Sequence, residues 1–234
     1  MTSMPSFVFD REDTYMYFAK DCLPDRPTIV EVGSIHGAHG TKLRRRFNDN
    51  ITMITYEAGK ENYESLCRDM APVPVQPSGG CNPPHVLNHR AAVTGCDGEV
   101  EFFEFQEISS NSIYPRHSNE GRHLRRASFV RSVSLETIMR ENMCSCIDLL
   151  FLNCEGAELG ILEEVLTKPL LRNRVGQICV SFHGGRVYPK EKTDAMVEKM
   201  SDFFWVVEEK NDWPCHLFVN KNFISTEGGN HGSS

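Results

Sequence analysis

The stretch that decides the fold is TIVEVGSIHGAHGTKLRRRF, residues 28–47. Its apolar run ends at the acid Glu31 and is followed by Gly33, Gly37 and Gly40, after which the chain has helical character. A buried strand that turns through glycines into a helix is where an open α/β sheet usually binds a cofactor. The stretch therefore predicts an α/β fold with a ligand at the carboxyl end of its first central strand.

Beyond this stretch, short apolar runs alternate with segments of helical spacing, which favours a parallel sheet covered by helices on both faces. We expect about seven strands, because continuous apolar runs are typical of strands buried on both faces. The main expected strands are residues 27–33, 51–58, 85–93, 147–152, 177–183, 203–210 and 215–222, and residues 128–142 are expected to form a strand that runs into a helix. Further helices are expected at residues 14–23, 40–48, 60–70, 157–166 and 192–204.

Turn and loop residues mark three other segments. Asp97-Gly98 is a favoured dipeptide for a tight turn between two strands, so residues 91–105 are predicted to form a β-hairpin. Residues 71–84 contain prolines and glycines that neither a helix nor a central strand accepts, and residues 106–127 are long and irregular. Both are expected to be loop insertions that border the site.

Length and composition fit one domain, with 234 residues of which 40% are hydrophobic. We expect residues 1–224 to form a single domain and the Gly/Ser-rich residues 225–234 to be a disordered tail. No signal peptide and no apolar run long enough to span a bilayer are recognisable. The nine cysteines include no CxxC pair, so we expect reduced thiols and a cytoplasmic protein.

The net charge of −7 argues against nucleic acid as a partner, because binding to a phosphate backbone needs a basic face. The one basic stretch, residues 116–131, is interrupted and loop-like. We expect it to be a solvated insertion, and a contact for an anionic substrate is the alternative.

The glycine loop matches neither of the two common phosphate-binding patterns. It lacks the GxG start of a dinucleotide site and the Lys-Ser/Thr pair of a P-loop. S-adenosylmethionine has no phosphate, and needs one acid for its amino-acid end and another for its two ribose hydroxyls. Glu31 would serve the first purpose and Glu57, at the end of the next strand, the second. A turn that binds nothing and an NAD site are the alternatives, since NAD enzymes also place an acid there.

A family resemblance supports this choice of cofactor. The segment IDLLFLNCEGAELGILEEVL, residues 147–166, resembles the D-x-x-K-I-D-x-E-G-A-E segment of the FkbM-type methyltransferases. Other segments are similar to further motifs of that family and follow in the family's order, namely residues 31–37, 56–66, 89–103, 130–139 and 181–185.

The resemblance implies a class I methyltransferase fold, a seven-stranded sheet in the order 3-2-1-4-5-7-6 with strand 7 antiparallel. It implies methyl transfer from S-adenosyl-L-methionine to a hydroxyl of a saccharide or other small molecule. Carried over residue by residue, the cofactor site would contain Glu31, Gly33, Ser34, Gly37, Glu57, Ala58, Ala91 and Asn153.

A hydroxyl that attacks a methyl group has to lose its proton, so a base is expected near the reacting atoms. His183 is the first candidate because it ends a buried strand, and its alternative role is that of a core histidine. Glu155 is the second candidate, although acids are also favoured at the start of a helix. Asn153 would face the sulfonium side of the pocket, Glu158 is expected to be structural, and no residue spacing demands a metal.

The chain departs from the family pattern in the first loop, where Glu31, Ser34 and His36 replace Asp, Ala and Asn, and at three later positions. Phe151 stands at the family's Lys, Asn153 at an Asp, and Ser181 at the acid that precedes Phe-His. These departures leave a second interpretation open, in which the chain is a methyltransferase-like module that binds a partner without catalysis. Turnover would separate the two interpretations.

Overall fold

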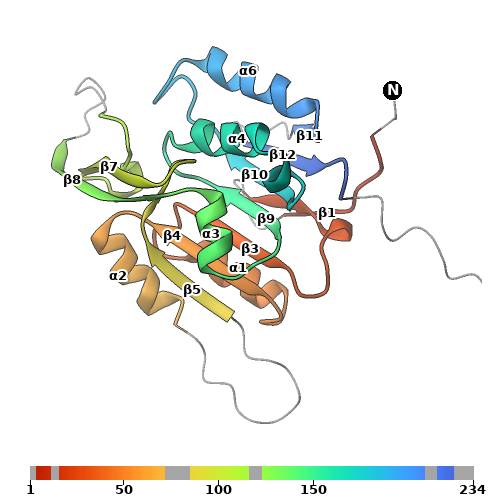
Figure 1. Cartoon of the computed structure of the whole chain (residues 1–234). Coiled ribbons are helices and arrows are strands. Elements are labelled where there is room, and N and C mark those ends of the chain that lie inside the picture. The colour runs from red at the N-terminus through yellow and green to blue at the C-terminus, as the bar shows by residue number, and fades with distance from the viewer. Residues whose placement is uncertain (1–3, 12–15, 72–84, 116–122, 209–214, 224–234) are drawn as a thin grey trace, which may run out of the picture.

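The central sheet has seven strands and determines the architecture of the chain (Figure 1). All its strands are parallel except β12, which is antiparallel to both of its neighbours. Across the sheet the strands are β5 (His85–Arg90), β4 (Thr52–Glu57), β3 (Thr28–Val32), β9 (Ile147–Leu152), β10 (Val175–Ser181), β12 (Cys215–Asn220) and β11 (Phe204–Glu208). Counted along the chain, this is the order 3-2-1-4-5-7-6 with strand 7 reversed, so the predicted class I methyltransferase fold is confirmed. The computed structural model describes residues 4–11, 16–71, 85–115, 123–208 and 215–223.

The two faces of the sheet pack against different helices. Val30 and Val32 of β3 belong to a buried cluster with side chains of α3, α4 and α6, whereas Ile29 belongs to one with α1, α2 and β2. This division follows from the alternation of side chains along a strand. The helices are α1 (Ala38–Arg46), α2 (Lys60–Asp69), α3 (Leu135–Glu141), α4 (Glu158–Thr167), α5 (Pro169–Arg172) and α6 (Lys190–Ser201), of which α5 was not predicted.

The predicted helix at residues 14–23 is wrong. The chain there forms β2 (Tyr17–Ala19), paired antiparallel with β1 (Phe9–Arg11), and a short 3-10 turn, η1 (Lys20–Cys22). The main-chain N–H of Ala19 donates to the side chain of Gln177, whose amide donates back to the Ala19 carbonyl, at 2.8 and 2.9 Å. These bonds to the central sheet favour the extended conformation over a helix, which would have to satisfy the same groups internally.

A second, three-stranded sheet replaces the predicted hairpin. It consists of β6 (Ala92–Val93), β8 (Leu124–Val133) and β7 (Gly98–Phe105), with β8 in the middle. The strands on either side of Asp97-Gly98 therefore pair with β8 and not with each other. Figure 1 shows β7 and β8 on the side of the molecule away from the N-terminus.

Asp97 explains why the tight turn does not form. Its carboxylate accepts hydrogen bonds from the Ser134 N–H at 2.8 Å and the Thr137 hydroxyl at 2.7 Å, and these bonds lower its pKa. Asp97 thus ties the start of α3 to the small sheet. The Ser134 hydroxyl accepts from the Thr137 N–H at 3.1 Å, as expected of the helix N-cap.

The basic stretch at residues 116–131 lies within the described residues only from 123 onward. Its C-terminal part belongs to β8, whose Arg125 forms two hydrogen bonds to Glu61 of α2, at 2.6 and 2.7 Å. In the same strand, Arg126 pairs with Glu104 and Arg131 with Glu141. The expectation of a loop across residues 106–127 is wrong for the residues that β8 contains.

The expected loop at 71–84, except for residue 71, and the expected tail at 225–234 lie outside the described residues. None of the eight cysteines within the described ranges forms a disulfide. Across those same ranges no helix is both long and apolar enough to cross a membrane.

Candidate active site

A cavity opens at the carboxyl ends of β3, β4 and β9, beside the small sheet. It contains about 490 Å³ of empty space, which includes the part open to solvent. Six of the predicted site residues line it, namely Gly33, Glu57, Ala58, Ala91, Asn153 and Glu155.

Glu31 does not reach the cavity. It is fully buried, and its carboxylate Oε1 lies 3.5 Å from Nδ1 of His39 in α1. A side chain added at Gly40 of α1 would lie 3.1 Å from Glu31 Oε2. Since the neighbouring Val32 lines the cavity, alternation along β3 turns Glu31 to the opposite face of the sheet.

Ser34, Gly37 and His183 do not line the cavity either. Ser34 is buried within the turn, where its carbonyl accepts a hydrogen bond from the Gly37 N–H at 2.8 Å. Gly37 has a positive φ of 69° at the start of α1, and a Cβ there would lie 2.4 Å from the side chain of Met70. Gly37 thus lets α1 begin close to α2.

Glu57 is held by two main-chain donors. Its Oε2 accepts from the Ile35 N–H at 3.0 Å and its Oε1 from the Gly59 N–H at 2.8 Å. The side chain is 5% exposed, and this burial raises the pKa of Glu57 to about 7, against the opposing effect of the two N–H groups. The Asn62 side chain also lowers this pKa, and both carboxylate oxygens remain acceptors for further donors.

Ile35 is a cavity residue that the sequence did not indicate. It has a positive φ of 50°, which is rare for a β-branched side chain. This conformation presents the Ile35 N–H to Glu57. Backbone strain of this kind persists only where the surroundings impose it, and it is frequent at functional sites.

Gly33 allows the ends of β3 and β9 to meet. Its φ is +83°, and a Cβ at this position would lie 2.0 Å from the carbonyl oxygen of Asn153. The Gly33 N–H donates to the Tyr56 carbonyl at 3.0 Å, and the Asn153 N–H donates to the Val32 carbonyl at 3.1 Å. Glycine is therefore required here by both conformation and space.

Four further wall residues, Asn62, Phe102, Asn111 and Ile113, were also missed. Asn62 comes from α2, and its side chain donates to the Ile108 carbonyl of the 3-10 turn η2 (Ile108–Ser110) at 3.4 Å. Phe102 lies on β7, and the other two come from the segment after η2. No local signal in the sequence shows that this segment folds back over the end of β4.

Glu155, His183 and Glu158 form a chain of contacts that runs from the cavity wall into the core. His183 is 1% exposed, with Nδ1 at 2.7 Å from Glu158 Oε1 and Nε2 at 3.2 Å from Glu155 Oε1. A carboxylate can only accept, so we assign the Nδ1 proton as the donor to Glu158, and the contact of Nε2 with Glu155 is an ion pair when the ring also carries a proton on Nε2. Glu158 also accepts from the Gly156 N–H at 3.1 Å and from the Tyr188 hydroxyl at 3.4 Å. Of the three, only Glu155 lines the cavity.

The cavity walls fit S-adenosylmethionine. Glu57 offers the two acceptor oxygens that a ribose diol requires. Ala91, Val93 and Phe102 form an apolar wall suited to the face of a purine. Among the described residues, no group of three or more His, Cys, Asp or Glu side chains is arranged to hold a metal ion.

Comparison with solved structures finds methyltransferases at low sequence identity. The pre-rRNA processing protein fibrillarin from Methanococcus jannaschii is 10% identical, with 84% of this chain and 67% of that chain covered and a TM-score of 0.46. An O-methyltransferase from Bacillus cereus in complex with SAH is 10% identical (83% and 74% covered, TM-score 0.40). TrmK from M. capricolum, in complex with S-adenosyl-homocysteine, is 11% identical (86% and 64% covered, TM-score 0.40). No curated protein matches the chain in sequence.

Family membership rests on a different comparison. The family model described as "Methyltransferase FkbM domain" matches residues 29–208, well over half of the chain. The matched range contains the strands that form the cavity, and the family's cofactor is the one that the cavity walls fit. The chain therefore belongs to the FkbM family of S-adenosylmethionine-dependent methyltransferases.

Proposed function

We propose that the chain is an O-methyltransferase that acts on a hydroxyl of a saccharide or another small molecule. The observation that carries this proposal is the contact between Glu155, which lines the cavity, and the buried His183. An oxygen nucleophile needs a proton acceptor beside it, and Glu155 supplies one with a second titratable group behind it. The net charge of −7 favours a small acceptor over nucleic acid.

In this mechanism, bound S-adenosylmethionine supplies the electrophilic methyl group. The Glu155 carboxylate accepts the proton of the attacking hydroxyl. His183 positions Glu155 through the 3.2 Å contact, and Glu158 fixes the ring of His183 through Nδ1. This replaces the expectation that His183 itself faces the acceptor, because Glu155 lies between the ring and the cavity.

For the cofactor, we propose that Glu57 accepts hydrogen bonds from the ribose hydroxyls and that Gly33 permits close approach of the main chain. Ala58, Ala91 and Asn153 would form walls of the same site, since all three line the cavity. Glu31, Ser34 and Gly37 would shape the loop from beneath without touching the cofactor, as their burial away from the cavity indicates.

A pH dependence of cofactor binding follows from Glu57. Its pKa of about 7 means that the carboxyl is largely protonated at pH 6 and largely ionised at pH 8. Only the ionised form has both oxygens available as acceptors. We expect the Kd for S-adenosylhomocysteine to be about tenfold higher at pH 6 than at pH 8. Calorimetric titration at the two pH values measures this.

Glu57→Gln is the control, since it removes the titration while keeping the shape. It should bind more weakly and lose the pH dependence. Ionisation of Glu57 is expected to strengthen cofactor binding as pH rises, but to lower the free energy of unfolding over the same change. The unfolded chain ionises near 4.5 and the folded chain near 7, so stability from Glu57 falls as pH rises through this window. An equal Kd at pH 6 and pH 8 would contradict ionisation of Glu57 as the basis of binding.

The chemistry of the acceptor is tested with a panel of nucleophiles. The intact chain is incubated with S-adenosylmethionine and sets of sugars, other alcohols, amines and thiols, and release of S-adenosylhomocysteine is measured. We expect turnover with hydroxyl acceptors. Turnover confined to amines or thiols would overturn O-methylation, and cofactor binding without turnover on any class would favour the non-catalytic module.

A further inference from the structure

The main chain at Glu155 has an unusual conformation. Glu155 has a φ of +51°, and the next residue, Gly156, has a φ of +118°. Glutamate rarely adopts a positive φ, so contacts from outside the segment have to impose this conformation. Because Glu155 lies on the cavity wall, the direction of its carboxylate depends on the orientation of this peptide group.

The Glu155–Gly156 peptide is held at both of its polar atoms. The Ser112 hydroxyl donates to the Glu155 carbonyl oxygen at 2.6 Å. At the opposite edge of the peptide, the Gly156 N–H donates to Glu158 Oε1 at 3.1 Å. Glu158 is also the partner of His183, so one carboxylate orients both the imidazole and the peptide that carries Glu155.

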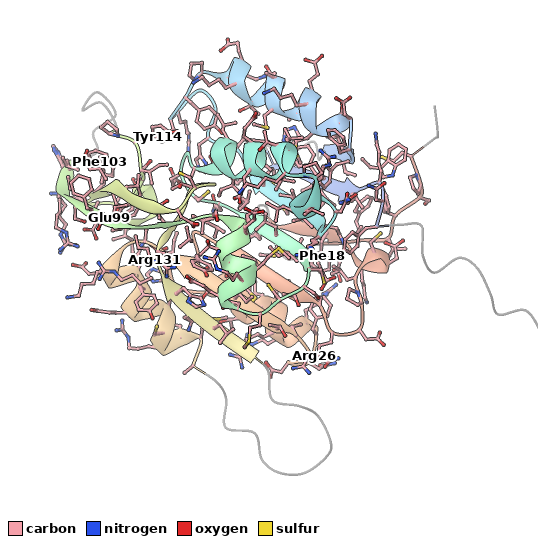
Figure 2. All side chains as sticks on the ribbon, in the orientation of Figure 1. Phe18, Arg26, Glu99, Phe103, Tyr114 and Arg131 are labelled. Carbon is pink, nitrogen blue, oxygen red and sulfur yellow. The ribbon has the colours of Figure 1, made fainter. Side chains whose placement is uncertain are left out.

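Ser112 is itself placed by the small sheet. Its N–H and carbonyl both pair with Phe103 of β7, at 3.1 and 2.8 Å. Its hydroxyl oxygen accepts from the Tyr114 N–H at 3.0 Å, which turns the hydroxyl proton toward Glu155. Ser112 is 1% exposed, so water does not compete for these bonds. Figure 2 shows Phe103 and Tyr114 close together on the side of the molecule that carries β7 and β8, far from Phe18.

The preceding residue links this contact to the other end of the cavity. Asn111 lines the cavity, and its side-chain oxygen accepts from the Phe105 N–H at 2.9 Å. A Cβ placed on Gly59 would lie 3.2 Å from both the Asn111 amide nitrogen and Glu57 Oε1. Asn111 and Ser112 are both held by β7. Asn111 therefore lies near Glu57, the proposed ribose acceptor, and Ser112 contacts Glu155, the proposed base.

We propose that Ser112 is a positioning residue for methyl transfer, which aims Glu155 by clamping its carbonyl group to the small sheet. The inference rests on the proposed function, because it assigns Ser112 a role through Glu155. Ser112 touches neither the cavity nor His183 in this assignment. Its effect on the reaction is carried by the 2.6 Å bond alone.

The test monitors the contact between Glu155 and His183 by NMR, so it does not require the methyl-acceptor substrate to be known. Imidazole ¹⁵N signals are recorded for the wild-type chain and for the Ser112→Ala, Glu155→Gln and Ser110→Ala variants, with His183→Asn to assign the signal. We expect Glu155→Gln to shift the His183 Nε2 signal and Ser112→Ala to shift it in the same direction. Ser110→Ala should leave it unchanged, because Ser110 is a buried serine of the same segment with no part in the Glu155 contact.

The outcomes separate the two proposals. A wild-type signal in Ser112→Ala, together with a shift in Glu155→Gln, would overturn the role of Ser112 and leave the proposed function intact. An unchanged signal in Glu155→Gln would overturn both, since no positioned carboxylate would then exist. If thermal unfolding shows that Ser112→Ala does not fold, Ser112→Cys replaces it. Its thiol is a weak donor of similar shape, and a smaller shift in the same direction is expected.

Discussion

Glu155→Gln is expected to lower kcat by about 10²- to 10⁴-fold, the range that a general base contributes. Glutamine has nearly the same shape but cannot accept a proton at neutral pH. Its amide can still contact His183, so the wall of the cavity should keep its form. The loss should therefore fall on kcat, while the Kd for S-adenosylhomocysteine stays unchanged, because Glu57 provides the proposed ribose contact. Steady-state kinetics with the acceptor found in the panel, combined with calorimetry, measures both.

Glu163→Gln is a matched control for this variant. Glu163 lies on α4 and pairs with Lys199 at 3.3 Å on the exposed side of the helix. The same change of charge there should leave kcat unchanged. A Glu155→Gln variant with wild-type kcat would show that the hydroxyl proton leaves by another route, and would remove the main support for O-methylation.

Gly33→Ala is expected to have the largest effect on stability. The new Cβ would face the Asn153 carbonyl oxygen at 2.0 Å, and the residue would keep a φ of +83°. The conformation costs about 1–2 kcal/mol and the overlap about 1–3 kcal/mol more, because strands β3 and β9 must move apart. We expect the free energy of unfolding to fall by roughly 2–5 kcal/mol. Denaturant unfolding measures the change.

Gly185→Ala separates the two contributions. Gly185 has nearly the same φ, +80°, but nothing lies within 4 Å of the position of its Cβ. This variant should lose only the conformational part, about 1–2 kcal/mol. Equal losses in the two variants would mean that β3 and β9 separate without cost, contrary to the close contact at Gly33.

The central sheet could be predicted because its signals are local. Most of the parallel strands are short segments rich in apolar residues, such as Ile147–Leu152, which is buried throughout although it includes Asp148. The small sheet could not be predicted in the same way. Asp97-Gly98 predicts a hairpin turn, but the strands on either side of it pair with β8, and Asp97 binds the start of α3. Pairing between distant segments leaves no pattern within either of them.

For the site, the positions of Gly33 and Glu57 followed from the ends of the first two strands, and both line the cavity. The position of Glu31 did not follow in this way. The motif at residues 31–37 specifies spacing along the chain, but not the face of the strand on which a side chain lies. Asn62 and Asn111 were missed for a different reason. Asn111 reaches the cavity through a fold-back of the chain, and Asn62 of α2 meets the same segment at the Ile108 carbonyl, so both depend on tertiary packing.

The place of β3 in the middle of the sheet has a consequence for biosynthesis. One of its partners, β4, follows soon after it, but the contact with β9 joins residues 120 positions apart, as between Thr28 and Asp148. At translation rates of about 5–20 residues per second, one edge of β3 waits roughly 6–24 s for its partner. During that time a ribosome-bound chain exposes an unpaired apolar edge, which is the kind of surface that chaperones protect and that aggregation exploits.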